Sequence, residues 1–315
     1  MTDEVTAKQL PIGPHRWRYA IITPVRDEEG YLEKTIQSVQ RQTVRPVCWV
    51  LVNDGSVDRT GEIINHWAAE EPWILAVHRD RSHLCDPKSA SRKVRAGRAL
   101  DAKEILAFHE GYTRVNTEEW DFLVKLDGDL SFEPDYFERC FREFDNDPRL
   151  GIGGGTLYNL VGGAHQREHT PRFHVRGATK IYRRACWEDI GGVIAGPGWD
   201  TLDEIEANRR GWSTRTFDSP SVIHLRFTGT ANGAWRNAVK NGVWSYVAGY
   251  HPVYMAVRCV RQLFRRPFLF GSVGLAYGFL YASLRGVPRG GSAETTKYVR
   301  QQQLRRLLNL RTIWK

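Results

Sequence analysis

The feature that most constrains the fold is a regular alternation of short apolar runs with amphipathic stretches, which begins at residue 19. Four of the apolar runs have the length of buried strands and cover residues 19–25, 47–54, 73–78 and 120–127. The stretches between them carry apolar residues at helical spacing and predict helices at 28–42, 58–70 and 99–112. Strands that alternate with helices are typical of βαβ units, so the sequence predicts an α/β fold with a mostly parallel sheet flanked by helices.

Two aspartates stand at the carboxyl ends of predicted strands. Asp54 ends the second strand and Asp127 ends the fourth. Ligands of parallel α/β sheets bind in the crevice outside the carboxyl ends of the strands. We therefore expect Asp54 and Asp127 to line one crevice.

The triplet Asp127-Gly128-Asp129 comes directly after a buried run. Two carboxylates this close repel each other unless water or a cation lies beside them. At a strand end they can share a hard divalent cation, Mg²⁺ or Mn²⁺, with substrate phosphates in the remaining coordination positions. A polar turn is the alternative for such a triplet, and its place after an apolar strand in an α/β pattern favours the metal site.

The segment PGWDTLDEIEANRRGW, residues 197–212, carries candidates for a general base. A general base needs one carboxylate within hydrogen-bond reach of the nucleophile. Asp200 stands just before a predicted helix, where it would serve equally well as a helix cap, and Asp203 follows it.

His224 and Arg226 occupy alternate positions of a predicted strand at 221–229, so we expect their side chains on one face. His224 is a candidate metal ligand, although a lone histidine is more often structural. Arg226 is a candidate diphosphate ligand, because a guanidinium binds phosphate oxygens in a two-pronged manner.

The charge is distributed unevenly along the chain. Residues 226–315 carry 15 Lys or Arg and one acid, whereas the rest of the chain carries 30 basic and 35 acidic residues. The uncharged run 268–284 lies within this basic region and is flanked by arginines on both sides. Its 17 residues fit a buried helix about as well as a membrane segment. The arginines and the neighbouring aromatic residues favour contact with a membrane surface.

Four segments, taken in order, resemble the family 2 glycosyltransferases, whose nucleotide-sugar domain has the GT-A type fold. They are TPVRDEEGYLEKTIQSVQRQT, DGSVDRT, the triplet Asp127-Gly128-Asp129, and IYRRACWEDIGG followed by Asp200. The resemblance implies an N-terminal extension at 1–16, a GT-A domain at 17–228 and a basic helical region at 229–315, with a membrane-associated segment at 268–284. It covers roughly two thirds of the chain and is specific only when the four segments are taken together.

The resemblance implies a metal-dependent, inverting hexosyltransferase. Such an enzyme moves a sugar from a nucleoside-diphosphate sugar to a hydroxyl acceptor, here a lipid-linked acceptor or a growing cell-surface glycan. The residues on the nucleotide-sugar side would be Pro24, Asp54, Asp127 and Arg226. The Mg²⁺ or Mn²⁺ cofactor would be held by Asp127, Asp129 and His224.

The resemblance also implies that Asp200 is the catalytic base, judged by its spacing to Gly211. Two features depart from the family pattern: Trp199 stands where a Glu is usual, and Asp203 competes with Asp200 for the role of base. The Gln-x-x-Arg-Trp motif of processive synthases is not clearly present, which weakens any inference of polymer synthesis.

Two other classes of protein are alternatives to this interpretation. A sugar-nucleotide nucleotidyltransferase would need a glycine-rich, basic loop after the first strand, where this chain has the acidic TPVRDEEG. A non-enzymatic protein that binds membranes or nucleic acid is the further alternative, and the absence of RNA or DNA motifs argues against nucleic acid. No secretory signal precedes the first strand, so we expect the protein at the cytoplasmic face of the cell membrane, held peripherally or by one inserted segment.

Overall fold

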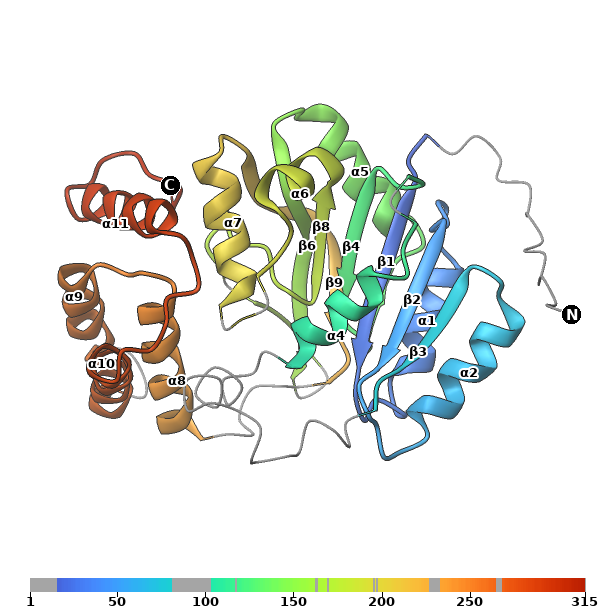
Figure 1. Ribbon diagram of the computed structural model, residues 1–315, viewed down its shortest axis with the longest axis horizontal. Helices are drawn as coiled ribbons and strands as arrows, with labels where there is room; N and C mark the ends of the chain where they lie inside the picture. Colours follow the sequence, from blue (N-terminus) through green and yellow to red (C-terminus); the bar gives the residue numbers. More distant parts are fainter. Residues whose placement is uncertain are drawn as a thin grey trace, which may run out of the picture.

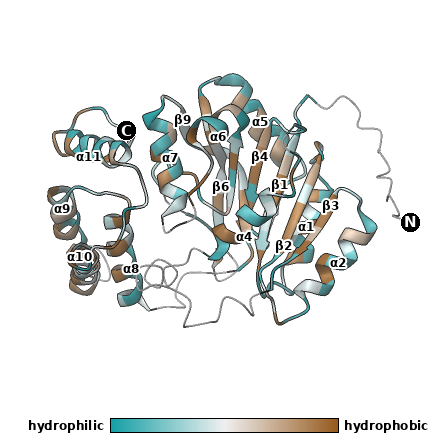
Figure 2. Cartoon of the chain, in the orientation of Figure 1, coloured by the Kyte–Doolittle hydropathy of each residue, from teal (hydrophilic) through white to brown (hydrophobic). Residues whose placement is uncertain are grey.

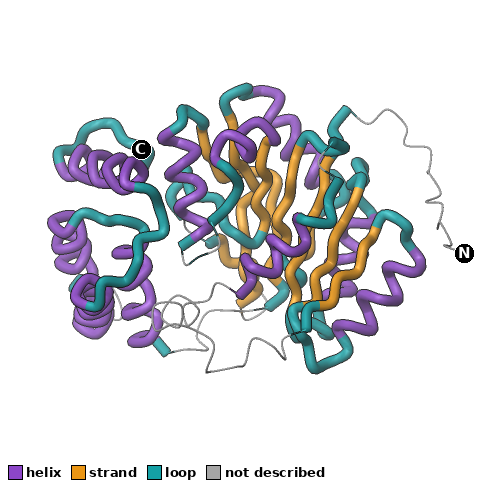
Figure 3. Tube along the Cα trace, in the orientation of Figure 1, coloured by secondary structure: helices purple, strands orange, loops and turns teal. Residues whose placement is uncertain are grey.

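A mixed β-sheet forms the centre of the molecule, and helices cover both of its faces (Figure 1; Figure 3). The computed structural model describes residues 16–80, 103–116, 118–161, 164–168, 170–194, 196, 198–226, 233–264 and 268–314. Several predicted segments lie wholly or partly outside these residues: the N-terminal extension up to residue 15, the start of the helix predicted at 99–112, and the end of the strand predicted at 221–229.

The strands are, in chain order, β1 (Tyr19–Val25), β2 (Cys48–Asn53), β3 (Ile74–His78), β4 (Phe122–Leu126), β5 (Leu130–Phe132), β6 (Leu150–Val161), β7 (Ala164–Arg167), β8 (Thr179–Arg183) and β9 (Ser213–His224). The helices are α1 (Leu32–Gln40), α2 (Thr60–Glu70), α4 (Lys103–Tyr112), α5 (Tyr136–Asn146), α6 (Arg184–Ile190), α7 (Trp199–Arg209), α8 (Ala234–Val247), α9 (Pro252–Gln262), α10 (Phe268–Leu284) and α11 (Ala293–Leu307). The four strands and three helices expected in the first part of the chain are all present.

The sheet order is β3-β2-β1-β4-β8-β6-β9-β5, with β7 paired to β6. The first four strands of this order are parallel, as predicted. The expectation of a mostly parallel sheet is wrong for the rest. There β8 lies antiparallel between β4 and β6, and the pairings β5–β9 and β6–β7 are antiparallel too. Among the described strands of that half, only β6 and β9 form a parallel pair.

The central strands are buried on both faces, which explains why they read as continuous apolar runs rather than as alternating ones. In β1, Tyr19 and Ile21 pack into a core with α1, α2 and α5, whereas Ala20 and Ile22 pack into a second core with α4, α6 and α7. Figure 2 shows these strands in hydrophobic colours at the centre of the molecule. The parallel strands therefore hold their carboxyl ends at one fixed edge.

The glycine-rich segment GIGGGT (residues 151–156) lies within β6. It is therefore part of a strand, although glycine-rich segments often form phosphate-binding loops. A Cβ atom at Gly154 would lie 2.2 Å from the carbonyl oxygen of Thr179, and one at Gly155 would lie 2.4 Å from that of Pro220. Only glycine permits this approach of neighbouring backbones. The close packing draws β8 and β9, which carry site residues, against β6.

The last four helices, α8 to α11, form what we call the C-terminal helical unit (residues 233–314), which lies beside α7 (Figure 1). The prediction that the basic tail is helical is confirmed for its described residues, and α9 begins at Pro252. The predicted domain boundary at 228 falls outside the described residues. Within the described part of the chain, no helix has both the length and the apolar character that crossing a membrane requires.

Candidate active site

A cavity of about 520 Å³ opens at the carboxyl edge of the parallel strands. Its walls come from both halves of the sheet, from the start of α7 and from α8 of the C-terminal helical unit. Asp54 and Asp127 both line it, which confirms the expectation that they share one crevice. The other predicted site residues in its lining are Pro24, Asp129, Asp200, His224 and Arg226.

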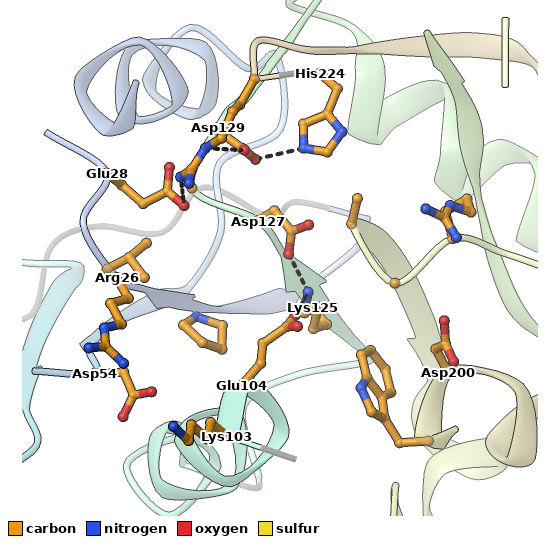
Figure 4. Close-up of a pocket in the computed structure, with 18 of the residues that line it drawn as sticks. Arg26, Glu28, Asp54, Lys103, Glu104, Lys125, Asp127, Asp129, Asp200 and His224 are labelled. Atoms are coloured by element: carbon orange, nitrogen blue, oxygen red, sulfur yellow. Dashed lines mark hydrogen bonds and ion pairs between the residues drawn. The ribbon is translucent and has the colours of Figure 1, made fainter. Parts of the chain in front are cut away.

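Asp127, Asp129 and His224 form a cluster whose ligand atoms all lie within 4.8 Å of one another. The aspartates are brought there by the turn between β4 and β5, and His224 is the last residue of β9, which pairs with β5. Figure 4 shows the three side chains converging in the cavity. Two carboxylates and one imidazole suit a divalent cation such as Mn²⁺ and leave coordination positions for substrate oxygens. The residues present therefore fit the metal that the sequence predicted.

Asp129 is buried and has a basic side chain next to each of its carboxylate oxygens. His224 Nε2 lies 3.1 Å from one oxygen, and Arg226 Nε lies 3.4 Å from the other. Arg226 also pairs with Glu28 at the entrance to α1. Burial and the charge of Asp129 raise the pKa of Glu28 to about 7, which shows how much negative charge is concentrated at this point.

Arg226 reaches the cavity from a different backbone position than expected. The strand β9 ends at His224, so Arg226 follows the strand instead of sharing a strand face with His224. Both side chains line the cavity nevertheless, and Asp129 contacts both. The shared carboxylate, and not the pleat of the strand, brings them together.

Asp127 is paired with a buried lysine. Lys125, two residues earlier in β4, forms ion pairs with Asp127 and with Glu104 at the start of α4 (Figure 4). Burial would lower the pKa of Lys125, but the two carboxylates raise it above its ordinary value. Burial raises the pKa of Asp127 to about 6 in spite of this ammonium group. The structure thus gives the two aspartates of the triplet different partners, Lys125 for the first and His224 with Arg226 for the second.

Asp54 lies in another part of the cavity lining, directly after the end of β2. It is buried, and its carboxylate accepts a hydrogen bond of 2.5 Å from Arg79 Nη1. Arg79 in turn binds Glu110 of α4 at 2.6 Å. Pro24 and Arg26 from the end of β1 lie next to Asp54 in the cavity lining. This corner holds fixed hydrogen-bonding groups on a rigid strand end.

Asp200 lies across the cavity from Arg26 and Asp54 in the view of Figure 4. It is the second residue of α7 and not the residue before the helix, because α7 begins at Trp199. Two buried ammonium groups lie near the ring of Trp199, with Lys125 Nζ 5.6 Å and Lys180 Nζ 5.5 Å from the ring centroid. Trp199 is itself buried, so it anchors the start of α7 directly before Asp200.

Asp203, the competing candidate for the base, lies outside the cavity lining. It is only 4% exposed, and its carboxylate accepts hydrogen bonds from Tyr182 at 2.6 Å and from Lys180 at 3.0 Å. A carboxylate enclosed in this way cannot reach a substrate hydroxyl. The assignment of Asp203 as a base is therefore corrected: it is a structural residue, and Asp200 is the carboxylate of α7 that faces the cavity.

Lys180 joins the first turn of α7 to the cavity wall. Its ammonium group donates to the backbone oxygen of Asp200 at 2.6 Å and pairs with Asp203 and with Glu204 Oε1 at 2.9 Å. Glu204 also accepts the backbone N–H of Val175 at 2.7 Å, just before the cavity-lining residues 176–178. The ammonium group of Lys180 therefore connects the start of α7, at Asp200, to the loop that follows Val175.

Replacing this cation should have a large effect on stability. Lys180→Met should lower the free energy of unfolding by about 3–5 kcal/mol, because Asp203 and Glu204 would remain buried without their partner. Chemical unfolding measures this change. The matched variant Arg59→Met, from an exposed pair with Glu62, should unfold almost like the wild type. Equal stability of Lys180→Met and the wild type would show that the buried network does not hold α7.

Several lining residues were not identified from the sequence: Glu28, Glu104, Lys125, Arg176, Lys240 and Trp244. Lys125 could have been predicted as a site residue from the sequence, because a charged residue inside an apolar strand needs a buried partner. Lys240 and Trp244 are four residues apart and so share one face of α8, where the ammonium lies 4.4 Å from the ring centroid. Nothing local in the sequence indicates that this face meets the cavity.

Comparison with known proteins gives a family match in the first part of the chain. Residues 20–84 match the model of the glycosyl transferase family 2. Glycosyltransferase GlyA of Streptococcus pneumoniae serotype 4 is 26% identical over 168 residues, which cover 52% of this chain and 20% of that protein. Chondroitin synthase of Pasteurella multocida is 26% identical over 157 residues, which cover 49% of this chain and 14% of that protein. The chain thus spans a fifth or less of the length of these two relatives.

Solved structures with the same fold cover most of the chain. The mannosyltransferase PcManGT from Pyrobaculum calidifontis, in complex with GDP-Man and Mn²⁺, has a TM-score of 0.52 and 15% identity, and the match covers 96% of this chain and 83% of that one. S. aureus TarS 1–349 in complex with UDP-GlcNAc has a TM-score of 0.51 and 13% identity, and the match covers 84% of this chain and 73% of that one. These likenesses concern the GT-A type fold. The family match and the curated relatives show that the first part of the chain is similar to the family 2 glycosyltransferases.

Proposed function

We propose that the protein transfers a sugar, as an inverting hexosyltransferase, from a nucleoside-diphosphate sugar to a hydroxyl acceptor. One observation carries the proposal: a single cavity holds the cluster of Asp127, Asp129 and His224 on one side and the carboxylate of Asp200 on the other. The nucleotide sugars bound by the two proteins of similar fold support this class of donor.

The donor would bind along the carboxyl ends of the parallel strands. Pro24 and Asp54 would contact the base and ribose, and Arg226 would contact the diphosphate. Asp127, Asp129 and His224 would hold a divalent metal, Mg²⁺ or Mn²⁺. When bound, such a cation neutralises the charge that develops on a diphosphate leaving group.

Asp200 would act as the general base. Its carboxylate would take the proton of the acceptor hydroxyl while that oxygen forms a bond to the anomeric carbon. The bond from the anomeric carbon to the phosphate oxygen breaks on the opposite side, and the nucleoside diphosphate leaves with the bonding electrons. This single displacement inverts the anomeric centre. The buried Lys180 and Trp199 would hold Asp200 in line with the reacting carbon.

The acceptor would be lipid-linked or part of a growing cell-surface glycan, and the protein would act at the cytoplasmic face of the membrane. The support for this part is the basic C-terminal helical unit, whose helix α8 forms one wall of the cavity through Lys240 and Trp244. A lipid-linked hydroxyl would approach along this wall.

The donor class can be tested by thermal unfolding in the presence of UDP-, GDP- and dTDP-linked sugars, each with Mn²⁺ or with EDTA. At least one nucleotide sugar should raise the melting temperature with Mn²⁺ and lose that effect with EDTA. Incubation with the same donor should release a nucleoside diphosphate. Release of pyrophosphate from a nucleoside triphosphate and a sugar phosphate would instead favour the nucleotidyltransferase alternative, and no response to any donor would contradict the proposal.

A further inference from the structure

Helix α10 turns its glycines inward and most of its large apolar residues outward. Its buried inner side consists of Gly271, Ser272, Gly274, Gly278 and Ala282 together with two large residues, Leu275 and Phe279. A Cβ atom at Gly278 would lie 2.1 Å from the carbonyl oxygen of Val239, so α10 packs backbone to backbone against α8. A helix of a water-soluble surface normally shows the opposite arrangement, with its large apolar side chains in the core.

The outward side of α10 is apolar along its whole length. Its exposed residues include Leu269, Phe270, Val273, Tyr277, Leu280, Tyr281 and Leu284. They recur every three or four residues, which places them on one stripe of the helix. Leu284 is 87% exposed and Phe270 is 73% exposed, values that leave these side chains almost wholly outside the described protein.

The neighbouring helix α9 continues this apolar surface. Val253 and Val260 of α9 are 54% and 55% exposed, and Phe264 beyond its end is 79% exposed. Among the described residues, 15 of the 19 exposed large hydrophobic side chains lie in the C-terminal helical unit. A concentration of this kind marks a surface that binds lipid or another protein.

The charges around the surface select between these two partners. Arg261 at the end of α9 and Arg285 directly after α10 are both exposed, and Glu294 is the only acid of residues 226–315. A surface with apolar residues at its centre, arginines at its edge and almost no acid complements an anionic bilayer. The same excess of positive charge disfavours a second copy of the chain as partner, because two such surfaces repel each other.

We propose that the outward face of α9 and α10, which we call the docking face, inserts into the headgroup region of an anionic membrane, with α10 lying in the membrane plane. Because α8 occupies the inner side of α10, this orientation leaves the inner side bound to protein and only the outer stripe in lipid. The opposite side of α8 carries Lys240 and Trp244 in the wall of the cavity. The helix pair α8 and α10 thus lies between the cavity and the docking face, a thickness of about two helix diameters, which suits a lipid-linked acceptor. This last point rests on the proposed function; the docking itself does not.

Vesicle sedimentation tests the docking face directly. The full chain should sediment with vesicles of phosphatidylcholine and phosphatidylglycerol at a ratio of about 3:1 and should bind pure phosphatidylcholine more weakly, as expected when basic residues contribute to binding. The triple variant Val273→Ser, Leu280→Ser, Leu284→Ser should lose at least about tenfold in vesicle affinity, because burial of each large side chain contributes substantially. The double variant Val57→Ser, Leu75→Ser removes exposed apolar side chains from the catalytic part and should bind like the wild type.

Two further variants are informative. The first separates the charge contribution to vesicle binding from the apolar contribution, and the second separates membrane docking from the proposed catalytic role. Arg261→Gln with Arg285→Gln should reduce binding to the anionic vesicles and leave the weak binding to phosphatidylcholine unchanged. Asp129→Ala should bind vesicles like the wild type, so a failure of the proposed catalytic role and a failure of membrane docking are distinguishable. Wild-type affinity of the triple variant would overturn the proposal. So would a dimer in solution that the triple variant converts to a monomer, because the face would then bind a second copy.

Discussion

Asp200→Asn is expected to reduce sugar transfer by about a hundredfold or more, the usual range for the loss of a general base. The amide keeps the shape of the side chain but cannot take a proton from the acceptor. The hydrogen bond that holds α7 here, from Lys180 to the backbone oxygen of Asp200, is unaffected by the change. Donor binding should therefore stay close to that of the wild type. Transfer of labelled sugar gives the rate, and the donor-induced shift in melting temperature gives the binding.

Asp203→Asn is the matched control, since it makes the same change three residues further along α7. Asp203 is enclosed by Lys180 and Tyr182 outside the cavity, so its variant should lose stability more than catalytic rate. The folded fraction of the Asp203 variant, measured below its melting temperature, should retain transfer activity. The reverse outcome, with Asp200→Asn active and well-folded Asp203→Asn inactive, would show that the cavity-facing carboxylate is not the base.

The second large effect is expected at the metal cluster. Asp129→Ala should abolish Mn²⁺-dependent binding of the nucleotide sugar, because it removes one of the two carboxylates within 4.8 Å of His224. Titration calorimetry with Mn²⁺, and with the donor in the presence of Mn²⁺ or EDTA, measures both parts of this result. Asp135→Ala is a suitable control, since this half-buried carboxylate lies outside the cavity lining and pairs with Arg139 of α5.

Removal of Asp129 also changes the charge around His224 and Arg226, so a conservative variant is needed. Asp129→Asn keeps the shape and one of the two acceptor oxygens, which can still accept a hydrogen bond from His224, but it is a poor ligand for a hard cation. It should fold like the wild type and still fail to bind Mn²⁺. If either variant binds the donor with wild-type affinity and wild-type dependence on Mn²⁺, the assignment of Asp129 as a metal ligand is wrong.

The sequence was sufficient for features that depend on local order and on strand direction. The apolar runs predicted β1 to β4, and the helices between them required these strands to be parallel. Parallel strands place their carboxyl ends at one edge, so the meeting of Asp54 and Asp127 followed without knowledge of any contact. The uncharged run 268–284 likewise predicted the extent of α10, because its period and composition are properties of the segment itself.

Only the tertiary structure decided which distant segments complete the site. The antiparallel position of β8 brings Lys180 beside α7, and the pairing of β5 with β9 brings His224 to Asp129. Each of these pairings joins residues far apart in the chain, and a strand's own sequence does not state which neighbour it will have. The helix α8 lines the cavity for the same reason.

The tertiary structure also decided the role of each charged residue. Asp200 and Asp203 are separated by less than one helical turn, yet one faces the cavity and the other is buried against Lys180 and Tyr182. Spacing in the sequence predicts which residues share a helix face, but what lies opposite that face depends on packing. The same holds for α10, whose apolar run predicted a helix while the glycine contacts with α8 determined that most of its large side chains face outward.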